Sequence, residues 1–90
     1  MELHIKGTYL EDNFSSRGAY LYRGQLKNNG KTLEKITGTS GLDFTDHVVD
    51  CLKKRRGKIT LKMTGDFKYE TEQLLKNVVE LYNKLQPKGR

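Results

Sequence analysis

Residues 58–64 show the clearest alternation of hydrophobic and polar positions in the chain. Ile59, Leu61 and Met63 alternate with lysines and threonines, which is the period of a β-strand with one buried face. The pattern stops at Gly65, because glycine weakens a strand interior and favours a turn. The sequence therefore predicts a strand that packs one face on a core and turns the other to solvent.

Three further strands are predicted before the first helix. Alternation of apolar and polar side chains predicts a first strand that runs from Leu3 to Leu10. Residues 18–23 are rich in strand-forming side chains and predict a second strand. The Asn-Asn-Gly-Lys sequence at 28–31 predicts a tight hairpin, because Asn-Gly accepts positive φ angles, and the chain returns over 32–37. These segments together predict a three-stranded antiparallel meander.

Helical spacing of apolar residues predicts a first helix after the meander. Asp43 is the predicted N-cap, and Asp46 stands three residues later in the capping-box position. The basic run at 53–56 ends this helix, and Gly57 is the predicted stop. One face of the helix carries the predicted core residues Phe44, Val48, Cys51 and Leu52.

A second helix is predicted from Asp66, which we expect to be its N-cap, and Pro87 and Gly89 end it. Its predicted apolar stripe is Leu74, Leu75, Val78, Leu81, Tyr82 and Leu85. With a polar connection at 11–16, the order is β-β-β-α-β-α in one α+β domain covering residues 1–90. Because both helices come late, we expect them to cover one face of the sheet and leave the other open.

Length and composition limit the kind of protein this can be. A chain of 90 residues forms one small domain that buries only roughly 60–65% of its unfolded surface. The single Cys51 excludes an internal disulfide framework and a cysteine-based zinc site, and His4 and His47 lack a repeated ligand spacing. No apolar run approaches the ~18 residues of a membrane span. We expect a soluble cytoplasmic protein with no membrane contact, no metal and no cofactor.

Charge is unevenly distributed along the chain. The net charge is +6; residues 1–50 hold six Lys/Arg and seven Asp/Glu, and residues 51–90 hold eleven and four. Asymmetry of this kind is typical of proteins with an anionic partner such as nucleic acid. The alternative is a basic surface that serves solubility alone.

The basic residues after the first helix are the candidate phosphate-binding stripe. The predicted nucleic-acid-binding residues are Lys53, Lys54, Arg55, Arg56, Lys58 and Lys62. The alternative is structural, because cations at a helix C-terminus complement its dipole. Tyr20 and Tyr22 share one face of the second strand, where they either stack on bases or pack against cross-strand neighbours or a covering helix.

Three short strings stand at corresponding places in the predicted elements, and with the element order they resemble the opening core of the ribonuclease H-like fold. They are residues 6–8 (Lys-Gly-Thr), 18–22 (Gly-Ala-Tyr-Leu-Tyr) and 64–69 (Thr-Gly-Asp-Phe-Lys-Tyr). In that family the first strand ends in Asp-Gly-Ser, the second reads much like 18–22, and the fourth ends in Thr-Asp-Ser and opens a helix. The resemblance spans nearly the whole chain and implies a truncated member of that fold.

The same resemblance implies that the family's catalytic set is missing. Family enzymes hold two divalent metals with carboxylates from the first strand, the first helix and the end of the fourth strand. Here Lys6 replaces the first-strand aspartate, and Phe44 falls near the first-helix glutamate, with Asp43 and Asp46 flanking it. Asp66 alone remains in place. We therefore expect no catalytic residues and no metal-dependent nuclease activity.

These observations predict a non-catalytic, nucleic-acid-binding accessory protein with a degenerate ribonuclease H-like fold. The alternative is a protein-interaction or self-assembling homodimeric module without a nucleic-acid role, which would use the open sheet face or an edge strand. Binding that weakens steeply with salt distinguishes the first hypothesis, and a dimer or a protein partner distinguishes the second.

Overall fold

The computed structural model describes residues 1–10 and 19–86. Its elements are β1 (Glu2–Leu10), β2 (Ala19–Asn28), β3 (Lys31–Gly38), α1 (Gly41–Lys53), β4 (Thr60–Gly65) and α2 (Tyr69–Lys84). The connection predicted for 11–16, the start of the second strand at Gly18 and the stop at Pro87 and Gly89 lie outside the described residues. No helix in the described ranges combines the length and the apolar character needed to cross a membrane.

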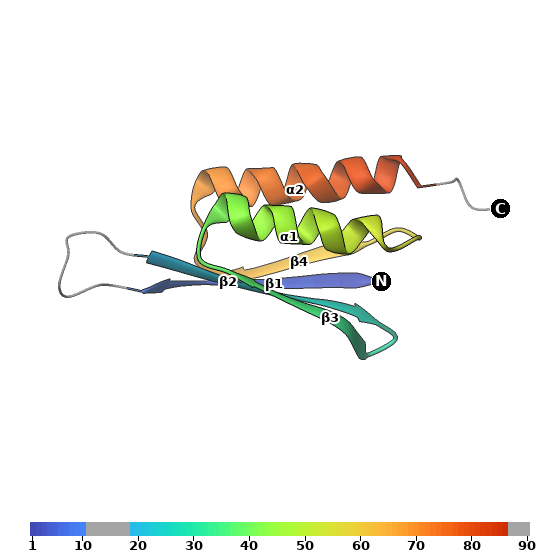
Figure 1. Cartoon of the computed structure of the whole chain (residues 1–90), viewed down its shortest axis with the longest axis horizontal. Helices are drawn as coiled ribbons and strands as arrows, with labels where there is room; N and C mark the ends of the chain where they lie inside the picture. The colour runs from blue at the N-terminus through green and yellow to red at the C-terminus, as the bar shows by residue number, and fades with distance from the viewer. Residues whose placement is uncertain (11–18, 87–90) are drawn as a thin grey trace.

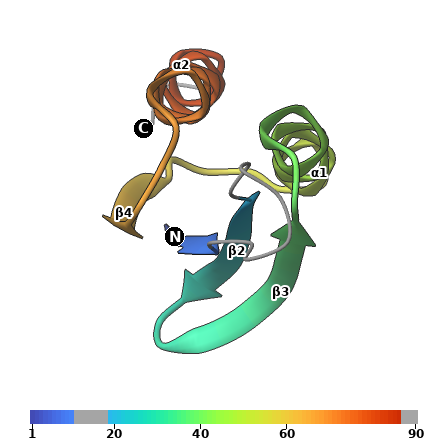
Figure 2. The same ribbon diagram turned by 90° about the vertical axis from the view of Figure 1, so that its left-hand side faces the viewer.

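The predicted α+β architecture and element order are confirmed. The four strands form one mixed sheet in the order β3-β2-β1-β4, in which β1 pairs antiparallel with β2 and parallel with β4. Both helices lie on the same side of the sheet (Figure 1). Viewed along the sheet, α2 lies over β4 and α1 lies over β3 (Figure 2).

The predicted hairpin between β2 and β3 is present. Asn29 has φ 54° and Gly30 has φ 83°, the two positive angles that a two-residue type I′ turn requires. Both flanking strands extend further toward the turn than the sequence pattern indicated, so that Asn28 pairs with Lys31. A register shift between Leu26 and Lys27 marks a β-bulge in this ribbon.

The hydrophobic core fills the space between the sheet and the two helices. Its buried residues are Leu3, Ile5, Tyr22, Leu26, Ile36, Phe44, Val48, Cys51, Leu52, Ile59, Leu75 and Val79. Every strand contributes alternate residues to it or packs against it, as the period-2 pattern predicts. The predictions of a buried Cys51 and an exposed His47 are confirmed.

Both predicted helix starts are wrong by two or three residues. α1 begins at Gly41 with Ser40 as N-cap, so Asp43 lies inside the first turn and is not the cap. α2 begins at Tyr69 with Lys68 as N-cap, and neither cap uses a side-chain hydrogen bond. Asp66 does not open α2, because the helix begins three residues later, and the Asp66 N–H donates to the carbonyl of Gly7 in β1 at 2.9 Å. Asp66 therefore still belongs to the end of the sheet.

The predicted apolar stripe of α2 is only partly correct. Leu75 is buried, and Val78 and Tyr82 pack against the core, but Leu74, Leu81 and Leu85 are exposed. Val79, which was not predicted, takes a buried place beside Leu75. α2 thus has an inner face on the core and a second apolar flank that the described residues leave open.

Candidate nucleic-acid interface

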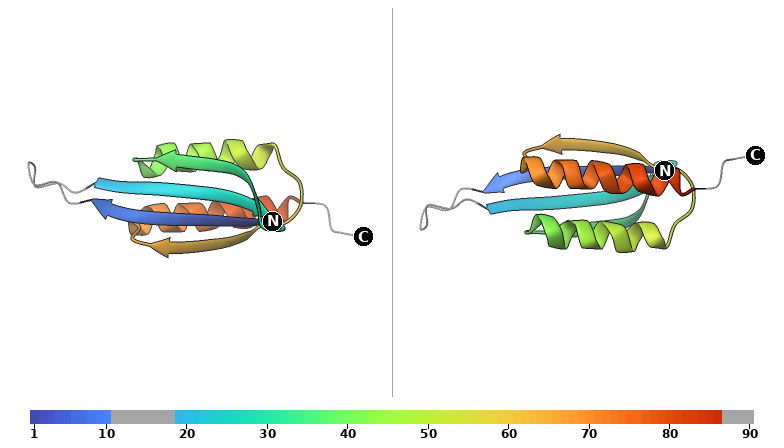
Figure 3. Two further views of the ribbon diagram at one scale, coloured as in Figure 1. Left: turned by 90° about the horizontal axis from the view of Figure 1, so that it is seen from below. Right: turned by 90° about the horizontal axis from the view of Figure 1, so that it is seen from above.

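The sheet face opposite the helices is open. Seen from that side, the four strands lie in front of both helices (Figure 3, left). Because Leu3, Ile5, Tyr22 and Leu26 point to the core, their strand neighbours point to the open face. From β1 to β4, the polar residues on this face are Glu2, His4, Lys6, Thr8, Arg23, Gln25, Lys27, Thr32, Lys35, Thr37, Thr60, Lys62 and Thr64.

Five of these residues, Lys6, Arg23, Lys27, Lys35 and Lys62, form what we call the basic face. Lys6 stands directly opposite Arg23 in the β1–β2 register, and both side chains are exposed. Like charges directly opposite each other destabilise an antiparallel pair. Thr37 lies next to Arg23 on β3, and Thr64 lies next to Lys6 on β4. Two cations between two hydroxyls form a row across the sheet that is suited to an anion.

Few negative charges offset the basic face. Glu2 is its one described carboxylate; it lies 3.4 Å from Lys62 Nζ and 2.8 Å from His4 Nε2. Hydrogen bonds from His4 and Lys62 lower the pKa of Glu2 below its usual value. Within the described ranges, no carboxylate lies within 4.0 Å of the Lys6 or Arg23 side chains. The centre of the face therefore keeps its positive charge.

The basic run predicted from the sequence lies elsewhere. Lys54 and Arg55 turn toward Glu34 on the helix side of β3, at 3.5 and 3.2 Å. Lys53, Arg56 and Lys58 are exposed around the α1–β4 connection. Of the six predicted cations, Lys62 alone lies on the open face. The connection precedes β4 and Asp66 follows it, so the run and Asp66 lie at opposite ends of the sheet (Figure 1).

Glu34 explains why part of that run is structural. Burial opposes the charge of Glu34, but hydrogen bonds from the Cys51 thiol and from Arg55, together with the charge of Lys54, lower its pKa below 4.5. Burial, reinforced by Glu34, raises the pKa of the Cys51 thiol to about 11. Cys51 is therefore a protonated, buried thiol, as predicted for a small hydrophobe, and the cluster ties α1 to β3.

Replacing Glu34 by glutamine is expected to lower the free energy of unfolding near neutral pH by about 1–2 kcal/mol, because charged hydrogen bonds to Arg55 and Lys54 are lost. Since folding lowers the pKa of Glu34 below 4.5, its contribution is present above that pH and disappears as pH falls through the folded-state pKa. Denaturant unfolding across the acid range measures this. Glu80→Gln, in an exposed pair with Lys84, is the control and should change little. Equal effects of the two variants at neutral pH would contradict the account.

The tyrosines of β2 belong to the covered face. Tyr22 is 1% exposed, with ring centroids 5.6 Å from Phe44 and 5.4 Å from Phe67. Tyr20 stacks on Tyr22 at 5.9 Å. The structural alternative is thus correct: Tyr22 packs against Phe44 of α1, and the Tyr20 ring lies 5.0 Å from that of its cross-strand neighbour Tyr9. Stacking of bases on Tyr22 is excluded by its burial. The basic face carries no aromatic side chain among the described residues.

The described residues do not gather a metal site. No group of three or more His, Cys, Asp or Glu side chains that could hold a metal ion occurs in 1–10 and 19–86. Phe44 is fully buried and faces the core, so its position on α1 could not offer a ligand to solvent. Asp66 shares an exposed hollow with Tyr9, Tyr20, Phe67 and Glu72. The predicted lack of nuclease activity stays a prediction.

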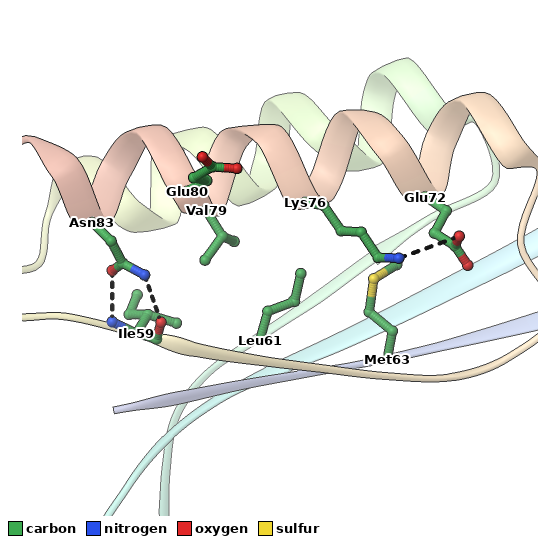
Figure 4. Close-up of a pocket in the computed structure, with 8 residues that line it drawn as sticks. All are labelled: Ile59, Leu61, Met63, Glu72, Lys76, Val79, Glu80 and Asn83. Carbon is green, nitrogen blue, oxygen red and sulfur yellow. Dashed lines mark hydrogen bonds and ion pairs between the residues drawn. The ribbon is translucent and has the colours of Figure 1, made fainter.

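A shallow groove of about 550 Å³ separates α2 from β4 (Figure 4). Leu61, Met63 and Val79 form its apolar wall. Asn83 closes one end by accepting from the N–H and donating to the carbonyl of Ile59, both at 2.8 Å. The charged groups at the other end, Glu72 and Lys76, pair with each other at 3.5 Å, so this groove offers no free acid–base pair.

Comparison with models of known protein families, with curated proteins and with solved structures found no match. The candidate site therefore depends on geometry. Sequence reasoning missed the basic face, although a signal was present: Lys6, Arg23, Lys35 and Lys62 each occupy a polar position of an alternating strand. What was missing was the pairing of the strands, which places these single cations side by side.

Proposed function

We propose that this protein is a non-enzymatic accessory protein that binds nucleic acid through the basic face. The observation that carries the proposal is the Lys6–Arg23 cross-strand pair, two exposed like charges held side by side. Such a pair lowers stability unless an anion occupies the space between the cations. A nucleic-acid phosphate supplies that anion, and relief of the repulsion between Lys6 and Arg23 contributes to the free energy of binding.

The side-chain types of the open face favour the nucleic-acid backbone as ligand. Phosphate and sugar contacts come mostly from Arg, Lys, Thr, Gln and similar donors, and most polar residues of the face are of these types. Base stacking needs exposed aromatics on the binding face, and Tyr20 and Tyr22 of β2 instead lie on the covered face of the sheet. The proposal is therefore binding with little dependence on base sequence.

The fold relationship is part of the proposal. Support comes from the strand order β3-β2-β1-β4 with a parallel β1–β4 pair, which agrees with a degenerate ribonuclease H-like core. Lys6 at the first carboxylate position would repel the metal ions that the family's enzymes bind. A domain of this kind would keep contact with nucleic acid and lack the cutting reaction.

The dependence of affinity on salt tests the proposal. With about four or five phosphates contacted, log K for duplex DNA should fall with log salt concentration at a slope of about −4. Fluorescence anisotropy with labelled duplex and single-stranded oligonucleotides of unrelated sequence measures this slope. Absent binding at low salt, or binding that does not change with salt, would contradict the proposal.

The single substitution Lys6→Glu is expected to separate function from stability. It replaces the repulsion toward Arg23 by attraction, which should raise the free energy of unfolding by about 0.5 kcal/mol while weakening nucleic-acid binding. Denaturant unfolding and anisotropy on the same preparation measure both. A variant that is less stable than the wild type, with unchanged affinity, would assign Lys6 a structural role instead.

A further inference from the structure

The outer surface of the two helices carries an apolar stripe. It follows the two helices, which lie in front of the sheet when the molecule is seen from above (Figure 3, right). Its residues are Leu42, Val49, Leu74, Val78, Leu81 and Leu85. Leu42 is 72% exposed, Leu81 59% and Leu85 73%. A contiguous apolar surface of this kind marks an interaction site more often than isolated exposed leucines do.

The stripe follows a groove in the surface at one of its ends. At its C-terminal end, α1 and α2 enclose a groove of about 460 Å³, lined by Val49 and Leu52 from α1 and by Val78, Leu81 and Leu85 from α2. On α2, residues 74, 78, 81 and 85 repeat at helical spacing, so their side chains form one flank of the helix. This flank accounts for the part of the predicted α2 stripe that the core does not use.

Charges at the two ends of the stripe have opposite sign. The helices run in the same direction (Figure 1), so both N-terminal ends lie together. Asp46, in the first half of α1, and Glu70, in the first turn of α2, are exposed toward that end, and Lys53 and Arg56 are exposed at the other. Helix dipoles add to the difference in electrostatic potential only weakly in solvent. Lys68 is a cation at the acidic end; its ammonium lies 5.9 Å from the centre of the Tyr20 ring, and the residue also borders the hollow lined by Leu42 and Leu74.

We propose that a second copy of this chain covers the stripe. A two-fold axis through the middle of the helical surface reverses the partner's helices, so the acidic end of each copy meets the basic end of the other. An isologous interface requires this kind of self-complementarity. A helix of an unrelated protein would fit only if its charges had the opposite order along the stripe. The resulting four-helix layer leaves both basic faces on the outside, and the inference does not depend on what those faces bind.

Sedimentation equilibrium of the full chain tests the inference. A monomer of 10.4 kDa should associate to twice that mass with a dissociation constant below about 100 μM. Leu81→Glu should raise the dissociation constant at least tenfold, because it places a carboxylate in the apolar centre of the interface. Leu33→Glu makes the same change at an exposed leucine of edge strand β3 and should leave the dimer intact.

Charge reversal gives the second readout. Reversing the acidic end (Asp46→Lys with Glu70→Lys) or the basic end (Lys53→Glu with Arg56→Glu) should weaken the dimer, and the chain carrying all four changes should regain it. Circular dichroism confirms that each variant is folded. A wild type that stays monomeric up to about 1 mM, a dimer that survives Leu81→Glu but not Leu33→Glu, or the absence of rescue would each overturn the inference.

Discussion

Replacing Gly7 by alanine is expected to lower the free energy of unfolding by about 3 kcal/mol or more, which is at the large end for a single substitution. A Cβ atom on Gly7 would overlap the backbone carbonyl oxygen of Asp66 and lie 3.2 Å from the Phe67 ring. The Asp66 backbone cannot move away without cost, because its N–H donates to the Gly7 carbonyl. The β1–β4 junction, and with it the start of α2, would have to shift.

Denaturant unfolding of the variant measures this effect, and Gly30→Ala is the matched control. Gly30 lies in the turn between β2 and β3 and has φ 83°, but a Cβ there meets nothing within 4 Å. Gly30→Ala should lower the free energy of unfolding by about 1 kcal/mol, which is the cost of a positive φ for a residue with a side chain. Similar small losses for the two variants would show that the close contact of β1 with the β4–α2 turn is not as described.

The architecture was predictable because its signals are local. Alternation at 58–64 and 3–10, the Asn-Gly turn at 29–30 and two helical patterns are each readable within one element. The helix starts were not predictable from Asp43 and Asp66, although aspartate is a good N-cap. At the second helix, Asp66 is still tied to the sheet, because its N–H donates to Gly7 in β1. At the first, the helix starts from Ser40, two residues after β3 ends.

The candidate site was harder to predict because it is assembled from four strands. Along the chain, the run 53–56 is the conspicuous basic feature, and the charge balance also pointed to the second half. In the structure, Lys6, Arg23, Lys27 and Lys35 come from the first half. The acidic residues that balance them in sequence, such as Glu34 and Asp46, lie on the helix side or on α1 itself. The net charge of a sequence segment adds up side chains that point to opposite faces of the sheet. It therefore does not reveal a charge that is concentrated on one face.

Reversing both central cations (Lys6→Glu with Arg23→Glu) is expected to weaken nucleic-acid binding about 100-fold at moderate salt, equivalent to about 2.7 kcal/mol. Two favourable phosphate contacts become two repulsive ones in the middle of the face. The double variant replaces one like-charge pair by another in the same register. Its stability should therefore stay close to that of the wild type, and the loss of affinity can be assigned to the surface.

Reversing two cations of the sequence-predicted run, Lys53→Glu with Arg56→Glu, is the matched control. It changes the net charge by the same amount and tests the alternative location directly. Both residues are exposed at the far end of α1, away from the open face. A long-range effect of the lost charge is screened within about 10 Å at 0.1 M salt, so the control should lose affinity by less than about fivefold.

The most direct test of the account is one anisotropy titration of the same labelled duplex with the wild type and these two double variants, all at one salt concentration. The account predicts salt-sensitive binding by the wild type, near-complete loss for Lys6→Glu with Arg23→Glu, and largely retained binding for Lys53→Glu with Arg56→Glu. Retained binding by the first variant together with loss by the second would place the interface on the α1–β4 connection and contradict the basic face as the binding surface.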